Sequence, residues 1–342
     1  MTLSARDGAR HVVHHCGGLR PGERVIVIGS EDTIEVTQLL AAEARTVTNF
    51  VEQYVIPVAR MHGAEPPAHV AEAMVAGDLV IGVTSKSMAH TGARLRACQN
   101  GARYLSLPEY SLDLLSSDDL DVDYLTLGAS VRRVTDALTA GNEVVVTTQK
   151  GTHLTTRIVG RIGNCCPGYV RDPGSLGSPP DIEANVSPLE TESNGRIVVD
   201  GSIAHPTIGV LSEPVTLFVE GGRIRRWEGP AHTLTRIERL FDGHPDNARV
   251  LAECGIGMNP RAVLRGLMLT DEGCAGAVHF GFGSNSTVGG LNSVDFHLDF
   301  CVRDASLAID GRPVLYRGVF AEWTGFTAVA HASSQPPAPG IA

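Results

Sequence analysis

The sequence contains no run of about 18 apolar residues, so nothing in it predicts a membrane-spanning helix. It also has no excess of basic residues: the formal net charge is -10, from 28 Lys and Arg against 38 Asp and Glu. A groove that binds nucleic acid would normally show the opposite balance. Residues 1–23 include no apolar core of signal-peptide length. We therefore expect neither membrane nor nucleic-acid partners.

The sequence also lacks any C-x-x-C motif. The chain has 7 cysteines, an odd number, and they are scattered without any C-x-x-C pair. That pattern favours reduced thiols in a cytoplasmic protein over a disulfide framework or a cysteine-based zinc site. The first expected strand, residues 23–30, is followed by no G-x-G-x-x-G, so its Gly29-Ser30 turn does not predict a dinucleotide site.

Glycine and proline are plentiful, at 38 and 19 residues, and they divide the chain into short segments. Up to residue 162, β-branched runs alternate with segments of helical apolar spacing, which predicts a parallel sheet with helices on both faces. A Gly/Pro-rich junction at 163–181 then leads into short β segments separated by turns. We expect an α/β fold, with an N-terminal parallel-sheet α/β domain at 1–162, a mixed α+β domain rich in short strands at 163–332, and a disordered tail at 333–342.

Ionisable side chains occur inside apolar runs of the second half. His297 and Asp299 lie two apart in "FHLDF", so a strand would direct both to one face. Glu183 in "DIEANV", Glu253 in "LAECGIG" and His279 in "AVHFGFG" have similar surroundings. Buried charges need a partner or a metal ion, and carboxylates with imidazoles suit Zn, Mn, Co or Fe.

The pattern alone leaves alternatives open for each residue. A histidine and a carboxylate on one strand face also fit a mutual hydrogen bond without any metal. A lone histidine in a strand is more often a hydrogen-bonded core residue, and a carboxylate beside a glycine turn is common. His244, in "DGHPDN", is typical of an exposed turn. Spacing therefore predicts a candidate metal site and no specific reaction.

These residues also carry a family resemblance. The stretches "EANVSP", "NGRIVVDGSI", "AECGIGMNP", "DEGCAGAVHFGFGSN", "VGG" and "FHLDF" resemble, in this order, the thermophilic-metalloprotease superfamily. That superfamily includes the M29 aminopeptidases and the iron-dependent 2,5-dihydroxypyridine dioxygenases. The resemblance runs from about residue 183 to 300, and the N-terminal half matches less specifically. It implies an enzyme that forms homodimers and acts on a small-molecule substrate.

The aminopeptidase resemblance implies two divalent metal ions, of Zn, Mn or Co, held by five side chains. These are Glu183, Glu253, His279, His297 and Asp299. The implied activity is hydrolysis of an amide or peptide-type bond by a metal-activated water. Glu272 in "TDEGCAG" is the candidate general base, and Asn285 is the candidate oxyanion donor in place of a tyrosine that these aminopeptidases carry.

The dioxygenase resemblance implies a different chemistry. The loop "SNSTVGG" at 284–290 is similar to a loop of those enzymes, which bind one Fe(II) through two histidines and one aspartate. His297 and Asp299 match two of these ligands, whereas Glu253 stands at the position of the first histidine, unless His279 substitutes for it. The alternative function is therefore a non-haem Fe(II) ring-cleaving dioxygenase. A third possibility is a family member that binds a ligand without catalysis.

Overall fold

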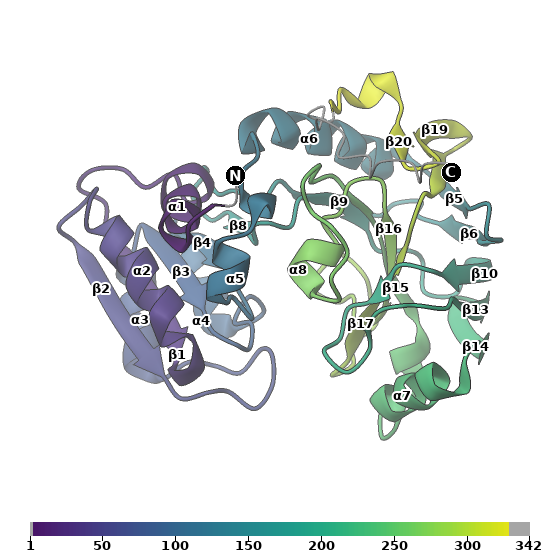
Figure 1. The fold of residues 1–342 in the computed structure, drawn as a ribbon, viewed down its shortest axis with the longest axis horizontal. Helices are drawn as coiled ribbons and strands as arrows, with labels where there is room; N and C mark the ends of the chain where they lie inside the picture. Colours follow the sequence, from purple (N-terminus) through teal and green to yellow (C-terminus); the bar gives the residue numbers. More distant parts are fainter. Residues whose placement is uncertain (1–2, 328–342) are drawn as a thin grey trace, which may run out of the picture.

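The β-branched runs of the N-terminal half form a five-stranded parallel sheet with strand order β2-β1-β3-β4-β8. Its strands are β1 (Val25–Ser30), β2 (Val51–Ile56), β3 (Leu79–Val83), β4 (Arg103–Ser106) and β8 (Leu176–Gly177). Figure 1 shows this sheet in the purple and blue lobe of the computed structural model, which describes residues 3–327. The tail expected at 333–342 lies outside the described residues.

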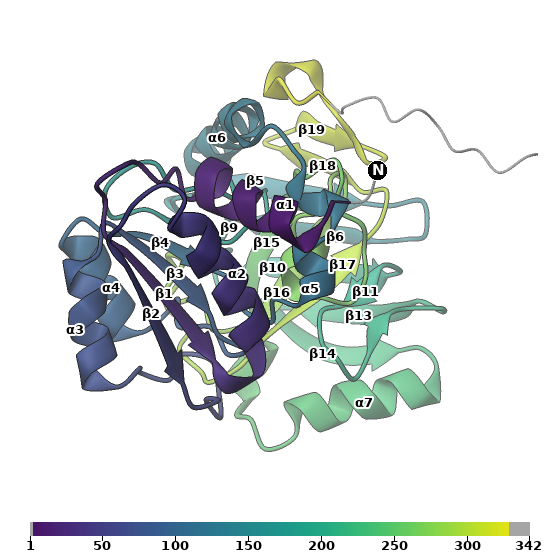
Figure 2. The same cartoon turned by 60° about the vertical axis from the view of Figure 1, so that its left-hand side comes forward.

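Helices cover both faces of the parallel sheet, as expected. The helices on one face are α1 (Ala5–Arg10), α2 (Ile34–Ala44) and α5 (Leu112–Leu115), and those on the other are α3 (Ala68–Ala76) and α4 (Gly92–Gln99) (Figure 2). Alternate residues of β1 supply the two cores, since Val25 and Val27 pack with α1 and α2 while Ile26 and Ile28 pack with α3 and α4. Strands buried on both faces explain the unbroken apolar runs.

The C-terminal lobe contains two antiparallel sheets of short strands. The eight-stranded sheet has the order β14-β13-β10-β6-β5-β18-β19-β20. Its strands are β5 (Glu143–Thr147), β6 (His153–Arg157), β10 (Ser193–Val199), β13 (Val215–Glu220), β14 (Arg223–Glu228), β18 (Ser306–Ile309), β19 (Arg312–Tyr316) and β20 (Val319–Phe320).

The seven-stranded sheet has the order β12-β11-β17-β16-β15-β9-β7 and lies between the parallel sheet and the eight-stranded sheet (Figure 1). Its strands are β7 (Asn164–Cys166), β9 (Glu183–Val186), β11 (Ser202–Ile203), β12 (Gly209–Val210), β15 (Leu251–Gly257), β16 (Val278–Gly283) and β17 (His297–Val302). The remaining helices are α6 (Tyr124–Ala140), which packs against β7 and β9, α7 (Ala231–Phe241) and α8 (Met268–Asp271). Within residues 3–327, no helix is both long and apolar enough to cross a bilayer.

The chain does not pass from the parallel sheet to the antiparallel sheets at a single point near residue 162, where the sequence analysis placed the domain boundary. β5 and β6 precede that residue, yet they pair with β18 and β10 of the C-terminal lobe. β8 follows it, yet it pairs with β4 of the parallel sheet. The chain therefore passes between the lobes more than once, and the junction at 163–181 runs along both.

A buried ion pair joins the two lobes. Asp119 lies in the 3-10 turn Asp118–Leu120, is 1% exposed, and accepts hydrogen bonds from the Arg265 guanidinium at both carboxylate oxygens, with Nη2 to Oδ1 at 3.1 Å. The Asn259 side chain adds a second connection, because its Nδ2 donates to the carbonyls of Asp119 at 2.9 Å and Pro180 at 2.7 Å. The segment that enters β9 is thereby positioned against the N-terminal lobe.

Replacing Arg265 by alanine should leave the buried Asp119 carboxylate without its cation. We expect the R265A variant to lose about 3 kcal/mol of unfolding free energy, the lower end for a broken buried pair because Arg265 is partly exposed. The matched control is R261A, since Arg261 pairs with Asp121 at 3.1 Å but both side chains reach solvent. That variant should lose less than about 1 kcal/mol. Urea unfolding of both variants checks the difference, and equal losses would contradict it.

Candidate metal site

Four neighbouring strands of the seven-stranded sheet carry the five side chains that the sequence singled out. Glu183 lies on β9, Glu253 on β15, His279 on β16, and both His297 and Asp299 on β17. These strands are adjacent in the sheet, in the order β17-β16-β15-β9. Alternation places apolar neighbours such as Phe280 and Phe300 in the hydrophobic core, which leaves the opposite face to the ionisable groups.

Each of these five residues faces a glycine on the adjacent strand. The pairs are Glu183 with Gly257, Glu253 with Gly281, His279 with Gly255, His297 with Gly283, and Asp299 with Gly281. Directly opposite residues share a face and come close together, so a side chain at these positions would fill the space. A Cβ on Gly255 would lie 2.0 Å from the His279 ring, and one on Gly281 would lie 2.6 Å from His297 Nε2. The glycines therefore make the room that the ionisable groups occupy.

The polar atoms converge within this space. His279 Nε2 lies 3.0 Å from Glu183 Oε2 and 3.5 Å from Glu253 Oε1. His297 Nε2 lies 3.6 Å from Glu253 Oε2 and 3.3 Å from Asp299 Oδ1. Glu253 thus lies between the two imidazoles, with one oxygen near each. Ligand atoms about 2.1 Å from a shared divalent ion lie roughly 3.0 to 3.4 Å from one another, close to these separations.

Several of these atoms have no hydrogen-bond partner although they are buried. They are Glu183 Oε2, both ring nitrogens of His279, and Asp299 Oδ1. Burying such groups without a hydrogen bond is costly, and a divalent cation would bind these atoms directly. Glu183, Glu253 and His279 offer ligand atoms within 4.8 Å of one another. The donor set and its unpaired atoms therefore fit a metal ion.

Mutual attraction shifts the pKa values of the imidazoles upward. Burial by itself would lower the pKa of His297, but the neighbouring carboxylates of Asp299 and Glu253 raise it to about 9. Burial likewise opposes protonation of His279, yet Glu183 and Glu253 raise its pKa well above the usual value. Burial would raise the pKa of Asp299, but the His297 charge lowers it to about 2. The His297 side chain is 34% exposed, so solvent screens part of this attraction.

Two further carboxylates belong to the cluster. Asp181, Glu183 and Glu272 also offer ligand atoms within 4.8 Å of one another. Burial and then neighbouring carboxylates, including Glu183, raise the pKa of both Asp181 and Glu272 well above the usual value. The sequence analysis missed Asp181, although it lies two residues before Glu183, the same spacing that drew attention to His297 and Asp299.

Neighbouring amides and carbonyls orient the ligand candidates. Asn185 Nδ2 donates to Glu183 Oε1 at 2.7 Å, and Asn164 Nδ2 donates in turn to Asn185 Oδ1 at 2.8 Å. His297 Nδ1 lies 3.0 Å from the Ser284 carbonyl, which accepts from it in the tautomer that leaves Nε2 free for a metal ion. Such outer contacts hold both the direction and the protonation state of metal ligands.

The two predicted catalytic residues have different environments. Glu272 directly follows α8 within the acidic cluster, where burial and neighbouring carboxylates raise its pKa, so its general-base role stays a prediction. Asn285 is fully buried in the 284–290 loop, where its Nδ2 donates to Glu190 Oε1 at 3.0 Å and its Oδ1 accepts from Asn292 N at 2.8 Å. The amide is therefore engaged inside the loop, and its oxyanion role stays a prediction. His244 is exposed after α7, with its ring 4.8 Å from that of Phe296.

The N-terminal lobe contributes a histidine that sequence reasoning did not identify. Partial burial, followed by the charges of Arg94 and His297, lowers the pKa of His90. His90 follows β3 in the loop that enters α4, so it comes from the carboxyl end of the parallel sheet. His297 is among the charges that lower its pKa, so the two imidazoles influence each other electrostatically across the lobes.

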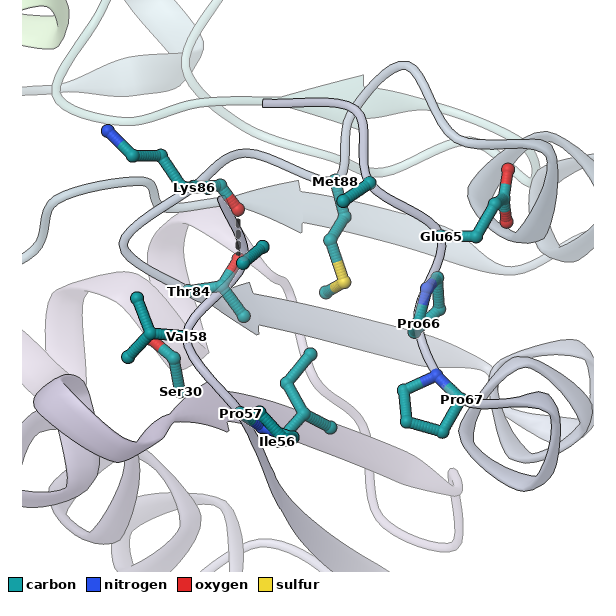
Figure 3. Close-up of a pocket in the computed structure, with 12 residues that line it drawn as sticks. Ser30, Ile56, Pro57, Val58, Glu65, Pro66, Pro67, Thr84, Lys86 and Met88 are labelled. Atoms are coloured by element: carbon teal, nitrogen blue, oxygen red, sulfur yellow. Dashed lines mark hydrogen bonds between the residues drawn. The ribbon is translucent and has the colours of Figure 1, made fainter. Parts of the chain in front are cut away.

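A separate cavity of about 360 Å³ opens at the carboxyl ends of β1, β2 and β3. Ser30, Ile56 and Thr84 contribute from these strand ends, together with Met88 and the Pro66–Pro67 segment. Figure 3 shows Met88 beside Thr84 and the ammonium end of Lys86 directed away from Met88. The strand order reverses at this edge, where open α/β sheets commonly bind ligands. The cavity shares no lining residue with the acid and imidazole cluster.

Comparisons with known proteins agree with this architecture. The family model described as NicX, 2,5-dihydroxypyridine 5,6-dioxygenase, matches residues 7–322. The solved 2,5-dihydroxypyridine dioxygenase of Pseudomonas putida KT2440 is similar with a TM-score of 0.82 and 19% identity, over 93% of this chain and 96% of that one. Wild-type AmpT of Thermus thermophilus is similar with a TM-score of 0.65 and 16% identity, over 92% and 98%. No curated protein sequence matches.

Replacing Gly255, which lies opposite His279, by alanine should weaken metal binding while every ligand side chain remains. In G255A the new Cβ would overlap the His279 ring and displace its Nε2, so we expect metal affinity to fall at least about tenfold. The control is G311A, where an added Cβ meets nothing within 4 Å and only the backbone conformation is strained. Calorimetric titration with Zn²⁺ should separate the two variants. Unchanged affinity in G255A would contradict the proposed role of the glycine.

Proposed function

Because the chain belongs to the NicX family of 2,5-dihydroxypyridine 5,6-dioxygenases, we propose that it is a non-haem iron enzyme that opens the ring of a small hydroxylated heteroaromatic compound. The observation that carries the proposal is the meeting of two imidazoles at one carboxylate, since His279 and His297 each approach a different oxygen of Glu253. Two histidines and a carboxylate are the donor set typical of Fe(II) oxygenases. The family match supports the ring-cleaving dioxygenase, our alternative, better than hydrolysis, our main expectation from the sequence, which it leaves unconfirmed.

His279, His297, Glu253 and Asp299 would hold the iron, which supplies the activation of dioxygen when bound. Residues outside this set keep the ligands in place. The Ser284 carbonyl orients His297, and Asn185 orients Glu183 at the edge of the cluster. Apolar strand residues below the sheet exclude water from that side.

His90 is the candidate proton acceptor for a substrate hydroxyl. Its lowered pKa keeps the ring neutral near pH 7, the state in which an imidazole accepts a proton. Its place on the opposite lobe allows a planar substrate to lie between His90 and the metal ligands. Ring hydroxyls become better electron donors once deprotonated, so this transfer would prepare the substrate for oxidation.

Oxygen consumption tests the proposal directly. Protein loaded with Fe(II) under anaerobic conditions should consume oxygen in step with loss of 2,5-dihydroxypyridine or a related hydroxylated pyridine. An oxygen electrode and ultraviolet absorbance of the ring measure the two quantities together. Iron-loaded protein that takes up no oxygen across such a panel would refute the dioxygenase proposal.

Removing the His90 imidazole should slow turnover without loss of iron. We expect kcat of H90Q to fall about 100-fold or more, the usual contribution of a positioned acid or base. The matched control is H69Q, because His69 is an exposed histidine on α3 of the same lobe. Steady-state kinetics with parallel iron analysis give the comparison. A fully active H90Q protein would remove His90 from the mechanism.

A metal-dependent hydrolase is the second candidate, favoured by the carboxylate-rich ligand set. Glu183 and Glu253 both approach His279, and such shared carboxylates suit a pair of Zn, Mn or Co ions that activate a water. Glu272 would then serve as general base. Cleavage of a dipeptide or amide panel by Zn-, Mn- or Co-loaded protein, without oxygen uptake, would favour this function over the first.

A further inference from the structure

Asp181 and Glu272, which form an acidic group with Glu183, have no role in the iron site described above. Its ligand atoms lie within 4.8 Å of one another, and Asp181 is 6% exposed while its Oδ1 has no hydrogen-bond partner. In residues 3–327, neither Asp181 nor Glu272 forms an ion pair with a lysine, arginine or histidine. We propose that these three carboxylates form a second cation site, which takes a hard divalent ion such as Mg²⁺ or Mn²⁺.

Backbone hydrogen bonds to the end of β15 hold this group together. Met258 N donates to the Ile182 carbonyl at 2.7 Å, and Asn259 N donates to the Gly273 carbonyl at 2.7 Å. The residues beside Asp181 and Glu272 are thereby fixed to adjacent points of one segment. Gly273 permits the approach, because a Cβ there would lie 3.2 Å from Asp181 Oδ1. The fold thus holds the three carboxyl groups in place.

Charge supports a second cation independently of geometry. The cluster contains five carboxylates, and the ion pairs of Glu183, Glu253 and Asp299 in the described chain are with the two imidazoles. When all five carboxylates are ionised, a single divalent ion at the imidazoles offsets two of the five negative charges, and the carboxylates left without a cation are costly to bury. A second divalent ion brings the cluster close to neutrality.

The donor types distinguish the two sites. Glu183 belongs to both groups and would bridge them, with its Oε1 oriented by Asn185. The group around His279 and His297 mixes nitrogen with oxygen, which suits iron or zinc. The group around Asp181 and Glu272 offers oxygen alone, which suits Mg²⁺ or Mn²⁺. This site does not depend on which reaction the first metal ion supports.

The test is a titration of metal-free protein with Mn²⁺ alone, followed by electron paramagnetic resonance and elemental analysis. The wild-type protein should bind two equivalents, and D181N and E272Q should each bind one, with the remaining equivalent unchanged in affinity. Wild-type protein that binds a single equivalent would overturn the proposal. So would variants that keep both equivalents, since the second ion would then lie elsewhere, or variants that lose both.

Matched controls and a stability readout separate a lost site from a lost fold. D242N and E213Q remove exposed carboxylates of the same lobe and should still bind two equivalents. Mn²⁺ should raise the melting temperature of D181N by less than that of the wild-type protein, and an equal rise would count against the site. If the wild-type protein binds two equivalents of Mn²⁺ but its iron-loaded form takes up no oxygen, the dioxygenase proposal is rejected and the second cation site is kept. If the iron-loaded protein takes up oxygen but the metal-free protein binds only one equivalent of Mn²⁺, the second cation site is rejected and the dioxygenase proposal is kept.

Discussion

Glycines opposite the five ligand candidates on the strands are the constraint on which the site depends. A β-sheet normally fills the space above each residue with the side chain of its cross-strand neighbour. In β15 and β16 the segments "GIG" and "GFG" leave that space open on one face, while Ile256 and Phe282 fill the core on the other. The same alternation therefore builds a packed interior and a polar hollow from a single pair of strands. Carboxylates and imidazoles can then be crowded without displacing the backbone.

The metal site also depends on where the seven-stranded sheet lies in the protein. The seven-stranded sheet adjoins a lobe with its own parallel sheet, and the pair of Asp119 with Arg265 joins the two lobes. Asn259 extends this connection to the segment that enters β9. The proposed binding of a small molecule between His90 and His297 depends on this fixed relation of the lobes. An active site between two lobes requires such a fixed relation more than it requires a deep cavity in either one.

Local patterns in the sequence predicted much of this arrangement. Unbroken apolar runs predicted the parallel sheet, and the two-residue spacing of His297 and Asp299 correctly placed both on one face of β17. The same spacing in "DIE" should have identified Asp181, and the glycine alternation in β15 and β16 was available but was not interpreted. Other features depend on contacts between distant residues. Arg265 meets Asp119 across 146 positions, and no local pattern indicates that Glu190 engages the Asn285 amide.

Asn164 has a consequence for how the 284–290 loop and the metal ligands are related. Its Nδ2 donates both to Asn185, which orients Glu183, and to the Val288 carbonyl of the loop at 3.2 Å. The Asn164 side chain thus couples the conformation of the 284–290 loop to the orientation of Glu183. Thermodynamic linkage makes any such coupling reciprocal, so an ion that favours this orientation of Glu183 also favours the ordered loop. The conformation of the 284–290 loop would then report whether the metal is in place.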